Sequence, residues 1–306
     1  MDVFKINNVN SQFGMSLIII VIGYTFKRLN LIKEEDGDGM ARILFNITLP
    51  ALIFVTFNSM KLDHSLILLT IISAVYGIIM SFIGVYAFRK EQKNMRGTLA
   101  MLVPGFNIGL FAYPLIQSIW GKNGLKYIGM FDMGNSLTMF IFCYIIAAYF
   151  STSETKIGIK EIVKKSFASV PLMAYIIILL VNLAGFHLPS QFISVCGIIS
   201  KANMPLSLLL LGVFLNFSIE KKYYKNIIKI LAVRYSIGLV LGIILFKILP
   251  FNSMFRYTIL IGLSLPIGMA VIPYAVQFNY DKKLVGALCN ITMILSFALI
   301  WIIIAL

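Results

Sequence analysis

Residues 104–114 read Pro-Gly-Phe-Asn-Ile-Gly-Leu-Phe-Ala-Tyr-Pro, in the middle of an apolar run long enough to cross a membrane. Proline removes a backbone donor and clashes with the preceding helical turn, so Pro104 and Pro114 are expected to interrupt a helix. The same two-proline pattern returns at Pro266 and Pro273. In a bilayer, the backbone groups freed by such a break must be buried in protein or line a wet cavity. The sequence therefore predicts two broken membrane helices.

Composition extends this interpretation to the whole chain. Of its 306 residues, 59% are hydrophobic and 12% are charged, whereas a soluble domain carries roughly 25% charged residues. Apolar runs of about 17 to 25 residues recur from end to end, and each can cross a hydrocarbon core of roughly 30 Å. We predict an all-α membrane protein with ten transmembrane helices, at residues 11–28, 40–59, 65–88, 97–120, 124–150, 167–186, 192–218, 227–249, 254–278 and 283–305.

The net charge of +14 does not indicate a nucleic-acid partner, because the lysines and arginines lie in short loops between apolar runs. Eighteen of these cations fall in alternate loops, and six fall on the opposite side. By the positive-inside rule the eighteen are cytoplasmic, so both termini are expected on the non-cytoplasmic side of a cell membrane. Membrane lipids are the expected surroundings of this multi-pass chain.

Prolines at corresponding positions indicate an internal repeat. Pro50 aligns with Pro205 at an offset of 155 residues, and Pro114 aligns with Pro273 at an offset of 159. Because each half holds an odd number of helices, the second copy would enter the membrane from the opposite face. We predict one membrane domain that consists of a first repeat, a short cytoplasmic linker and a second, inverted repeat, at residues 1–150, 151–166 and 167–306.

The broken segments are the expected binding site. Unwound backbone exposes amides and helix N-termini, whose partial positive charge suits an anionic ligand. The expected substrate-binding residues are Gly105, Asn107, Ile108, Pro266, Ile267 and Gly268. Asn107 is the one polar side chain of this set. The alternative is that the prolines make simple kinks, which are common in membrane helices.

Asp132 lies inside the fifth predicted helix. An ionised carboxylate there costs at least about 2.5 kcal/mol, so it should face the bundle interior with a partner. Asp132 and Asn135 are candidates for proton or ion coupling, and Asn290 lies near the corresponding place in the tenth helix. The alternative is a structural carboxylate, hydrogen-bonded to Asn135, Ser136 or a backbone amide.

Two further cations lie within apolar runs. Arg234 follows a basic loop and is expected to reach back to lipid headgroups, while Lys201 either binds a substrate carboxylate or extends to the outer surface. No metal or resident cofactor is expected, because no metal-ligand or redox spacing occurs among Cys143, Cys196, Cys289, His64 and His187. A proton or a sodium ion is the candidate coupling ion. Hydrolase, phosphate-loop and zinc motifs are absent from the sequence, so an enzyme is not expected.

Residues 107–115, Asn-Ile-Gly-Leu-Phe-Ala-Tyr-Pro-Leu, followed by Gly121, resemble the fourth-helix signature of the auxin efflux carrier family. Asp132 and Asn135 resemble the Asp-x-x-Asn of its bacterial members, and similar segments occur along essentially the whole chain. Phe106 departs from the pattern, since plant members often have proline there. The short linker favours a bacterial-type, malate-permease-like member.

The resemblance implies a five-plus-five inverted repeat in which the broken fourth and ninth helices cross, as in sodium/bile-acid symporters and NhaA-like antiporters. It also implies a substrate pocket beside the crossing, where Asn107 would contact a carboxylate. The expected function is a secondary transporter, a permease or efflux carrier of small organic anions that works by alternating access. The alternatives are a membrane-embedded ligand sensor with the same pocket and a sodium-coupled carrier of another solute. A homodimer is the candidate assembly.

Overall fold

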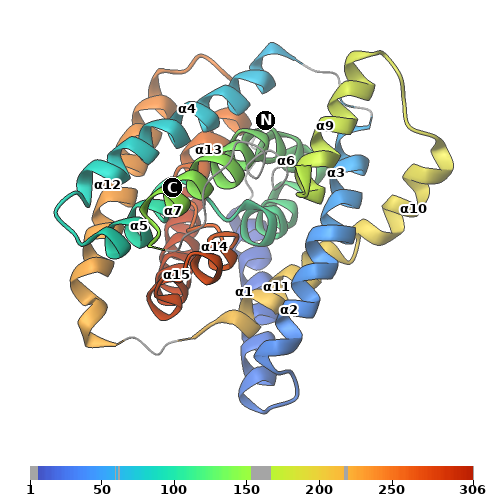
Figure 1. Ribbon diagram of the computed structural model, residues 1–306. Coiled ribbons are helices and arrows are strands. Elements are labelled where there is room, and N and C mark those ends of the chain that lie inside the picture. Colours follow the sequence, from blue (N-terminus) through green and yellow to red (C-terminus); the bar gives the residue numbers. More distant parts are fainter. Residues whose placement is uncertain (1–5, 59, 61–62, 153–166, 217–219, 306) are drawn as a thin grey trace.

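The computed structural model describes residues 6–58, 60, 63–152, 167–216 and 220–305. This part of the chain is all-helical, as predicted (Figure 1). The first half contains α1 (Ile6–Arg28), α2 (Glu34–Ile43), η1 (Leu44–Thr48), α3 (Leu49–Phe57), α4 (His64–Ala87), α5 (Lys93–Met101), η2 (Ile108–Ala112), α6 (Tyr113–Leu137), η3 (Thr138–Cys143) and α7 (Tyr144–Phe150). The second half contains α9 (Val170–Leu183), α10 (Ser190–Ser200), α11 (Asn203–Phe214), η4 (Lys221–Tyr223), α12 (Tyr224–Ile248), α13 (Ser253–Gly262), α14 (Val271–Gln277) and α15 (Lys282–Ala305).

Six helical stretches of the described chain are long and apolar enough to cross a membrane, so the protein is a multi-pass membrane protein. They are Glu34–Phe57, Ser65–Ala87, Ile108–Phe150, Ser190–Phe214, Lys221–Ile248 and Lys282–Ala305. The third stretch has 43 residues, about twice the length that one crossing requires. It bends inside α6 at Gly121, where φ is 58° and ψ is −147°. Essentially only glycine adopts this backbone conformation, which explains why the turn forms there.

The predicted helix boundaries agree with the structure to within a few residues where the apolar runs are uninterrupted, at 65–88, 227–249 and 283–305. Two predicted helices are interrupted by non-helical backbone. The first break (residues 102–107) separates α5 from η2, and the second break (residues 263–270) separates α13 from α14. The predicted linker at 151–166 lies almost entirely outside the described residues.

Pro50 and Pro205 lie in two long, irregular helices. Pro50 is in the first turn of α3, directly after the π-helix η1, and Pro205 is in the first turn of α11. The first turn of α11 tolerates proline because the N–H groups at a helix start lack helical acceptors. Pro50 instead follows a continuous π-helix, in which the Leu49 N–H still bonds to the Leu44 carbonyl. Beside them, the Thr48 hydroxyl donates to Asn203 Oδ1 at 2.9 Å, across a separation of 155 residues. Both side chains are buried, so this bond ties the two helices together inside the protein.

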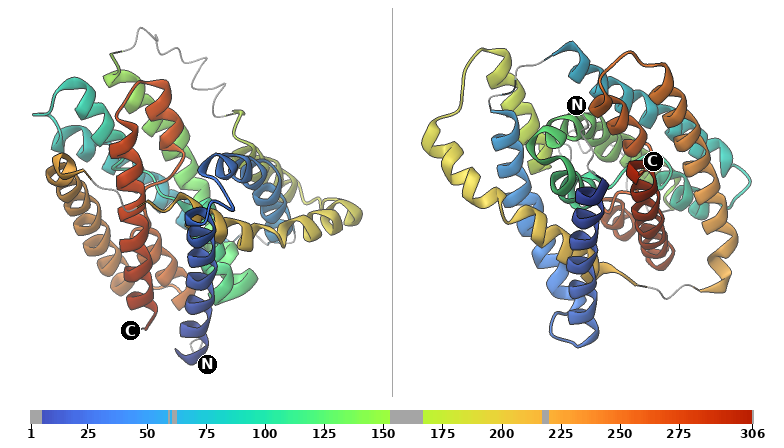
Figure 2. Two further views of the ribbon diagram at one scale, coloured as in Figure 1. Left: turned by 90° about the horizontal axis from the view of Figure 1, so that it is seen from below. Right: turned by 180° about the vertical axis from the view of Figure 1, so that it is seen from behind.

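The helices pack in two groups. The panel group consists of α1–α3 and α9–α11, in which α1 and α2 pack on α11, and α3 packs on α9 and α10. The crossing group consists of α4–α7 and α12–α15, in which α4 packs on α5 and α6, α12 packs on α13, and α14 packs on α15. In the left view of Figure 2, α2, α3 and α9–α11 (blue, olive and yellow) lie on one side and the crossing group (cyan, orange and red) lies mainly on the other, with α1 between them. Because α6 also contacts α1, α3, α9 and α11, it forms much of the boundary between the groups.

The start of α1 and the end of α15 lie at the same end of the molecule (Figure 2). The Trp301 indole N–H donates to Asn10 Oδ1 at 2.9 Å, which joins these two segments. At the other end of the same helix pair lie Lys27 and Arg28, which end α1, and Lys282, which begins α15. The start of α1 and the end of α15 therefore lie at the opposite end of this helix pair from these basic residues.

Candidate functional site

The two interrupted helices meet at their breaks. Phe106 of the first break and Ile267 of the second form an isolated antiparallel β-bridge. Next to it, the Asn107 N–H donates to the Pro266 carbonyl at 2.9 Å. One break thus satisfies backbone groups that the other break has freed, as a low-dielectric interior requires.

Side chains of neighbouring helices satisfy further backbone groups at this crossing. Asn135, on α6, accepts from the Phe106 N–H at 2.9 Å and donates to the Phe106 carbonyl at 3.1 Å. Thr292 Oγ1, on α15, accepts from the Ile267 N–H at 3.1 Å. Asn135 and Thr292 are both buried. An unpaired buried backbone group costs about 1–3 kcal/mol, so these contacts fix the path of the unwound chain.

Arg234, on α12, also lies at the crossing. Its side chain is 3% exposed, and its guanidinium donates to the carbonyls of Leu102 at 3.0 Å, Leu265 at 3.2 Å, and Val103. It lies over the Phe106 ring, 5.1 Å from the centroid. The expectation that Arg234 reaches the lipid headgroups is wrong, because carbonyls at the breaks provide acceptors inside the protein.

Asp132 lies on α6 and is 7% exposed. Its Oδ2 accepts from the Tyr175 hydroxyl at 2.8 Å, and its Oδ1 accepts from Asn135 Nδ2 at 3.3 Å. The Tyr175 and Tyr113 hydroxyls are hydrogen-bonded to each other. Within the described chain, Asp132 has hydroxyl and amide partners and forms no ion pair. Since Tyr175 belongs to α9, the bond between Asp132 and Tyr175 joins the crossing group to the panel group.

A small cavity of about 60 Å³ lies beside the crossing, between the two helix groups. The panel group contributes apolar side chains such as Phe45 and Leu49, and the crossing group contributes the polar ones, which are Asn107, Asp132, Asn135 and Ser136. Asn107 is 5% exposed, and its side-chain amide has no hydrogen-bond partner among the described residues. That amide is therefore available to a ligand in the cavity.

The structure brings most of the predicted site residues to this place. Besides the polar residues, Ile108 and Gly268 line the cavity. Pro266 and Ile267 supply backbone contacts of the crossing, and Gly105 packs against Met139. Asn290 lies elsewhere on α15, half-buried and outside the cavity lining. Lys201 is exposed at the turn between α10 and α11 and also lies outside the lining.

The four prolines have two different positions. Pro104 and Pro266 lie inside the two breaks. Pro114 and Pro273 lie in the first turn of α6 and of α14, respectively. The second proline of each pair therefore lies within the helical segment that follows the break; for Pro114 this segment already begins at η2, where the Tyr113 N–H bonds to the Ile108 carbonyl.

Sequence reasoning missed three residues of the site, Arg234, Tyr113 and Tyr175. Arg234 lies about three turns inside α12, and its distance from the basic loop was the available signal. The two tyrosines resemble the other aromatic residues of apolar runs. Tyr175 is 43 residues away from Asp132 in the sequence, so no local pattern connects the two.

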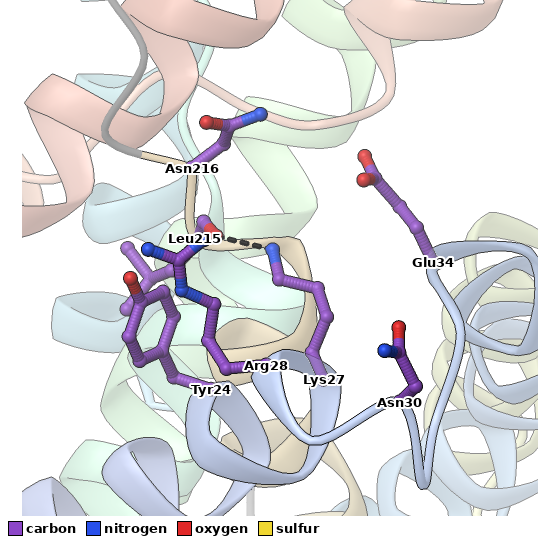
Figure 3. Close-up of a pocket in the computed structure, with 7 residues that line it drawn as sticks. All are labelled: Tyr24, Lys27, Arg28, Asn30, Glu34, Leu215 and Asn216. Atoms are coloured by element: carbon purple, nitrogen blue, oxygen red, sulfur yellow. Dashed lines mark hydrogen bonds between the residues drawn. The ribbon is translucent and has the colours of Figure 1, made fainter.

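A larger pocket, of about 360 Å³, lies where α1 ends (Figure 3). Its lining consists of Tyr24, Lys27, Arg28, Asn30, Glu34, Leu215 and Asn216. Lys27 Nζ donates to the Leu215 carbonyl, as the dashed line in Figure 3 shows. Neither break contributes to the lining. We therefore place the functional site at the crossing.

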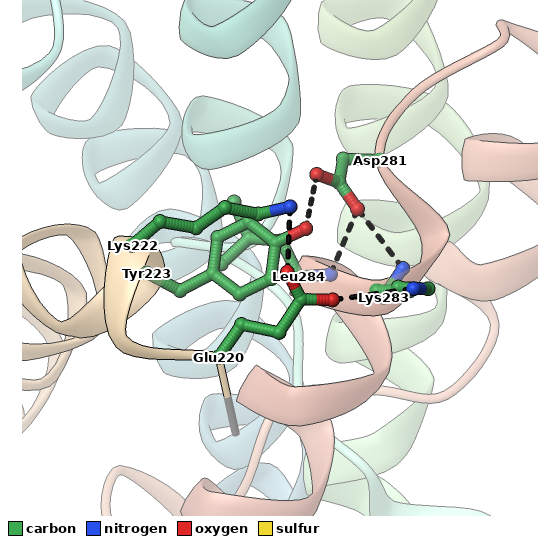
Figure 4. A network of polar contacts seen from close by, with 6 residues as sticks. All are labelled: Glu220, Lys222, Tyr223, Asp281, Lys283 and Leu284. Atoms are coloured by element: carbon green, nitrogen blue, oxygen red, sulfur yellow. Dashed lines mark hydrogen bonds and ion pairs between the residues drawn. The ribbon is translucent and has the colours of Figure 1, made fainter. Parts of the chain in front are cut away.

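A charged cluster near the start of α12 connects this segment to α15 (Figure 4). Glu220 forms ion pairs with Lys222 at 2.6 Å and with Lys283 at 3.2 Å. The Tyr223 hydroxyl donates to Asp281 Oδ2 at 2.6 Å. Hydrogen bonds from Lys222 and then Lys283 lower the pKa of the Glu220 carboxyl. The cluster lies at the basic end of the molecule, away from the crossing.

Two broken helices that meet beside a cavity, in a multi-pass membrane protein, are the features of a solute transporter. The chain belongs to the membrane transport protein family, whose model matches residues 16–304. This match confirms the resemblance to the auxin efflux carriers. The protein is therefore a transporter.

Two archaeal relatives are similar over nearly their whole length. An uncharacterized transporter of Methanothermobacter thermautotrophicus is 25% identical over 285 residues, which cover 92% of each chain. An uncharacterized transporter of Methanocaldococcus jannaschii is 22% identical over 295 residues, which cover 93% of this chain and 94% of the relative. Both names describe transporters, in agreement with the family.

Proposed function

We propose that this protein is a secondary transporter that carries small organic anions, such as carboxylates, by alternating access. The observation that carries the proposal is the side-chain amide of Asn107, which belongs to a residue that lines the cavity and has no hydrogen-bond partner in the described chain. Its N–H groups are free to donate to a ligand with an acceptor group. A carboxylate is such a ligand. The start of the helix that follows Asn107 adds partial positive charge.

The position of the cavity supports alternating access. A volume of about 60 Å³ is small beside the roughly 300 Å³ or more of typical ligand sites. A carboxylate with several carbon atoms enters only if the panel group and the crossing group move apart. Since residues of both groups line the cavity, such a movement changes its access to either side of the membrane.

Asp132 supports a proton as the coupling ion. It shares the cavity with Asn107, and two like charges in one site disfavour the ionised form of each. Binding of an anion therefore favours protonation of Asp132, and loss of that proton favours release of the anion. Asn135 holds the Asp132 carboxyl in place through its side-chain amide.

The transporter would have ten membrane crossings in two inverted repeats, at 1–150 and 167–306. Two contacts support this architecture because they join residues that the repeat aligns. Thr48 bonds to Asn203 at an offset of 155 residues, and Asn107 bonds to Pro266 at an offset of 159. Equivalent residues touch when they lie near the two-fold axis of an inverted repeat. Both termini would face the non-cytoplasmic side of the cell membrane.

Uptake into proteoliposomes tests the proposal. The purified protein is reconstituted, and uptake of radiolabelled monocarboxylates and dicarboxylates is compared with uptake by protein-free vesicles. Asn107→Ala should lower the uptake at least about tenfold, the effect of losing a charge-assisted hydrogen bond of about 1.5–3 kcal/mol. The matched control is Asn46→Ala, which changes an exposed asparagine on the panel group. Absence of uptake for every carboxylate, with folded protein in the vesicles, would refute the proposed substrate class.

A further inference from the structure

We propose that Arg234 is a resident cation, which occupies the place at the crossing where a coupling sodium ion would otherwise bind, so that transport needs no sodium. The part of this proposal that concerns transport rests on the proposed function. The resident-cation site itself is a property of the folded protein and can be tested without transport.

The first argument is the convergence of carbonyl groups from both breaks. Leu102 and Val103 directly follow the end of α5, and Leu265 follows the end of α13. The last carbonyls of a helix lack helical partners and carry its partial negative charge. The Leu102 carbonyl is at the end of α5, and the Val103 and Leu265 carbonyls lie in the unwound backbone just beyond α5 and α13; all three accept hydrogen bonds from the Arg234 guanidinium. Backbone carbonyls of unwound membrane helices are the groups that coordinate sodium in secondary transporters, and here a guanidinium occupies them.

The second argument is the charge balance. Arg234 is buried, and no carboxylate of the described chain forms an ion pair with it. Its positive charge is balanced by carbonyl dipoles and by the Phe106 ring, whose centroid is 5.1 Å from the guanidinium. Arginine keeps its charge under all physiological conditions. The crossing therefore holds one permanent positive charge, which neutralises the carbonyl ends and leaves no need for a mobile cation.

The third argument comes from the alignment of the two halves. At the offset of 159 residues, Tyr235 aligns with Tyr76, but Arg234 aligns with Val75. Likewise, Asp132 aligns with the uncharged Ile291. The two halves thus share a backbone plan but not these charges, so the charges do not follow from the repeat.

The cation and the carboxylate are connected through the crossing. Arg234 lies over the ring of Phe106, the backbone of Phe106 bonds to Asn135, and Asn135 bonds to Asp132. An anion that binds at Asn107, next to Phe106, is close to this path. The fixed positive charge favours that anion in every step of the cycle, while Asp132 gains and loses its proton.

Charge-selective variants separate this role from simple packing. Arg234→Gln keeps a hydrogen-bond donor without the charge, and Arg234→Lys keeps the charge on a different donor. If Arg234 attracts the anion, Arg234→Gln should raise KM at least about tenfold, which corresponds to about 1.4 kcal/mol. Arg234→Lys should keep KM close to the wild-type value. A KM of Arg234→Gln equal to that of the wild type would overturn the proposal.

The effect of added cations on the thermal stability of the protein tests the Arg234 site without a transport assay. We would measure thermal unfolding of the purified full chain in detergent, with choline chloride replaced by sodium chloride or guanidinium chloride, and with urea as the neutral analogue of guanidinium. The wild-type Tm should be the same in sodium and choline. Arg234→Ala should have a lower Tm than the wild type. Low concentrations of guanidinium or sodium should raise the Tm of this variant, and urea should leave it unchanged. The control is Arg96→Ala, which removes an arginine bonded to the Val85 carbonyl away from the crossing and should respond to neither cation.

The outcomes distinguish this inference from the proposed function. Carboxylate uptake by the wild type that requires sodium would overturn the resident cation and leave the proposed function intact. No uptake of any carboxylate, together with a cation-specific rise in the Tm of Arg234→Ala, would refute the proposed function and support the resident cation. An Arg234→Ala variant that responds to neither cation would overturn the inference. If that variant yields no folded protein, the KM values of the Gln and Lys variants and the sodium response of the wild type decide.

Discussion

Replacement of Asn135 by alanine should destabilise the crossing, because one side chain satisfies both backbone groups of Phe106. Asn135 accepts from the Phe106 N–H at 2.9 Å and donates to its carbonyl at 3.1 Å. Asn135→Ala leaves both groups buried without these partners, at about 1–3 kcal/mol each. The expected loss of unfolding free energy is therefore about 2–6 kcal/mol. The longer bond to Asp132, at 3.3 Å, adds less.

Thermal unfolding of the purified protein in one detergent measures this loss. At roughly 2–4 °C per kcal/mol for a chain of this size, the Tm should fall by about 5–20 °C. Hydrogen exchange provides a local readout, since the Phe106 amide should exchange faster in the variant. The matched control is Asn290→Ala, which removes a half-buried asparagine without a described partner and should change the stability by no more than about 0.5 kcal/mol.

A result at the wild-type Tm, with unchanged exchange at Phe106, would refute the reasoning. It would mean that the Phe106 backbone finds other partners at no cost. The antiparallel bridge between the two breaks would then be enough to hold the crossing.

Three further changes test other contacts. Gly268→Ala should cost about 1–3 kcal/mol in thermal unfolding and slow carboxylate uptake, because the added Cβ would lie 2.8 Å from the Phe106 carbonyl oxygen. Tyr175→Phe removes the hydroxyl donor of Asp132 and should lower the unfolding free energy by about 1–3 kcal/mol. Glu220→Gln should lower the Tm at neutral pH and have no effect in acid. The ion pairs lower the pKa of Glu220 from 4.5, so their contribution is present above that pH and is lost as the pH falls through the lowered pKa.

Each of these changes has a control of the same chemical type. Gly286→Ala places a methyl group where no described atom lies within 4 Å, Tyr149→Phe changes an exposed tyrosine, and Glu35→Gln changes an exposed carboxylate without a described ion pair. All three should behave as the wild type. A Gly268→Ala protein of unchanged stability would contradict the close packing at the crossing. A Glu220→Gln effect that persists in acid would show that the charge of Glu220 is not its cause.

Local signals in the sequence predicted the all-helical membrane fold and both breaks. Apolar length determines which segments enter a bilayer, and Pro104 and Pro266 interrupt their helices because proline cannot donate to the helical ladder. The residues expected to bind substrate lie together because a crossing brings the two breaks to one place. Asn107 and Gly268 line the same cavity although they come from different halves of the chain.

Long-range partners were beyond the reach of the same reasoning. The positive-inside rule assigns a cation to one side of the membrane from the loop nearest to it. It therefore grouped Arg234 with the basic segment before α12, at the lipid headgroups. One of its actual acceptors, the Leu102 carbonyl, is 132 residues away. That carbonyl becomes an acceptor only because α5 ends there. The partner of a buried charge thus depends on where another helix stops, which no local pattern near Arg234 contains.

The turn at Gly121 has a stereochemical consequence. Its φ of 58° and ψ of −147° are close to the mirror image of the polyproline II conformation, near −75° and +145°. An added Cβ would have no described atom within 4 Å, so an L-residue is disfavoured there by about 1–3 kcal/mol of backbone strain and not by lack of space. A D-alanine, introduced by chemical ligation, would adopt its ordinary extended geometry and should stabilise the turn. What this position requires is the opposite handedness, and glycine is the one ribosomal residue that can supply it.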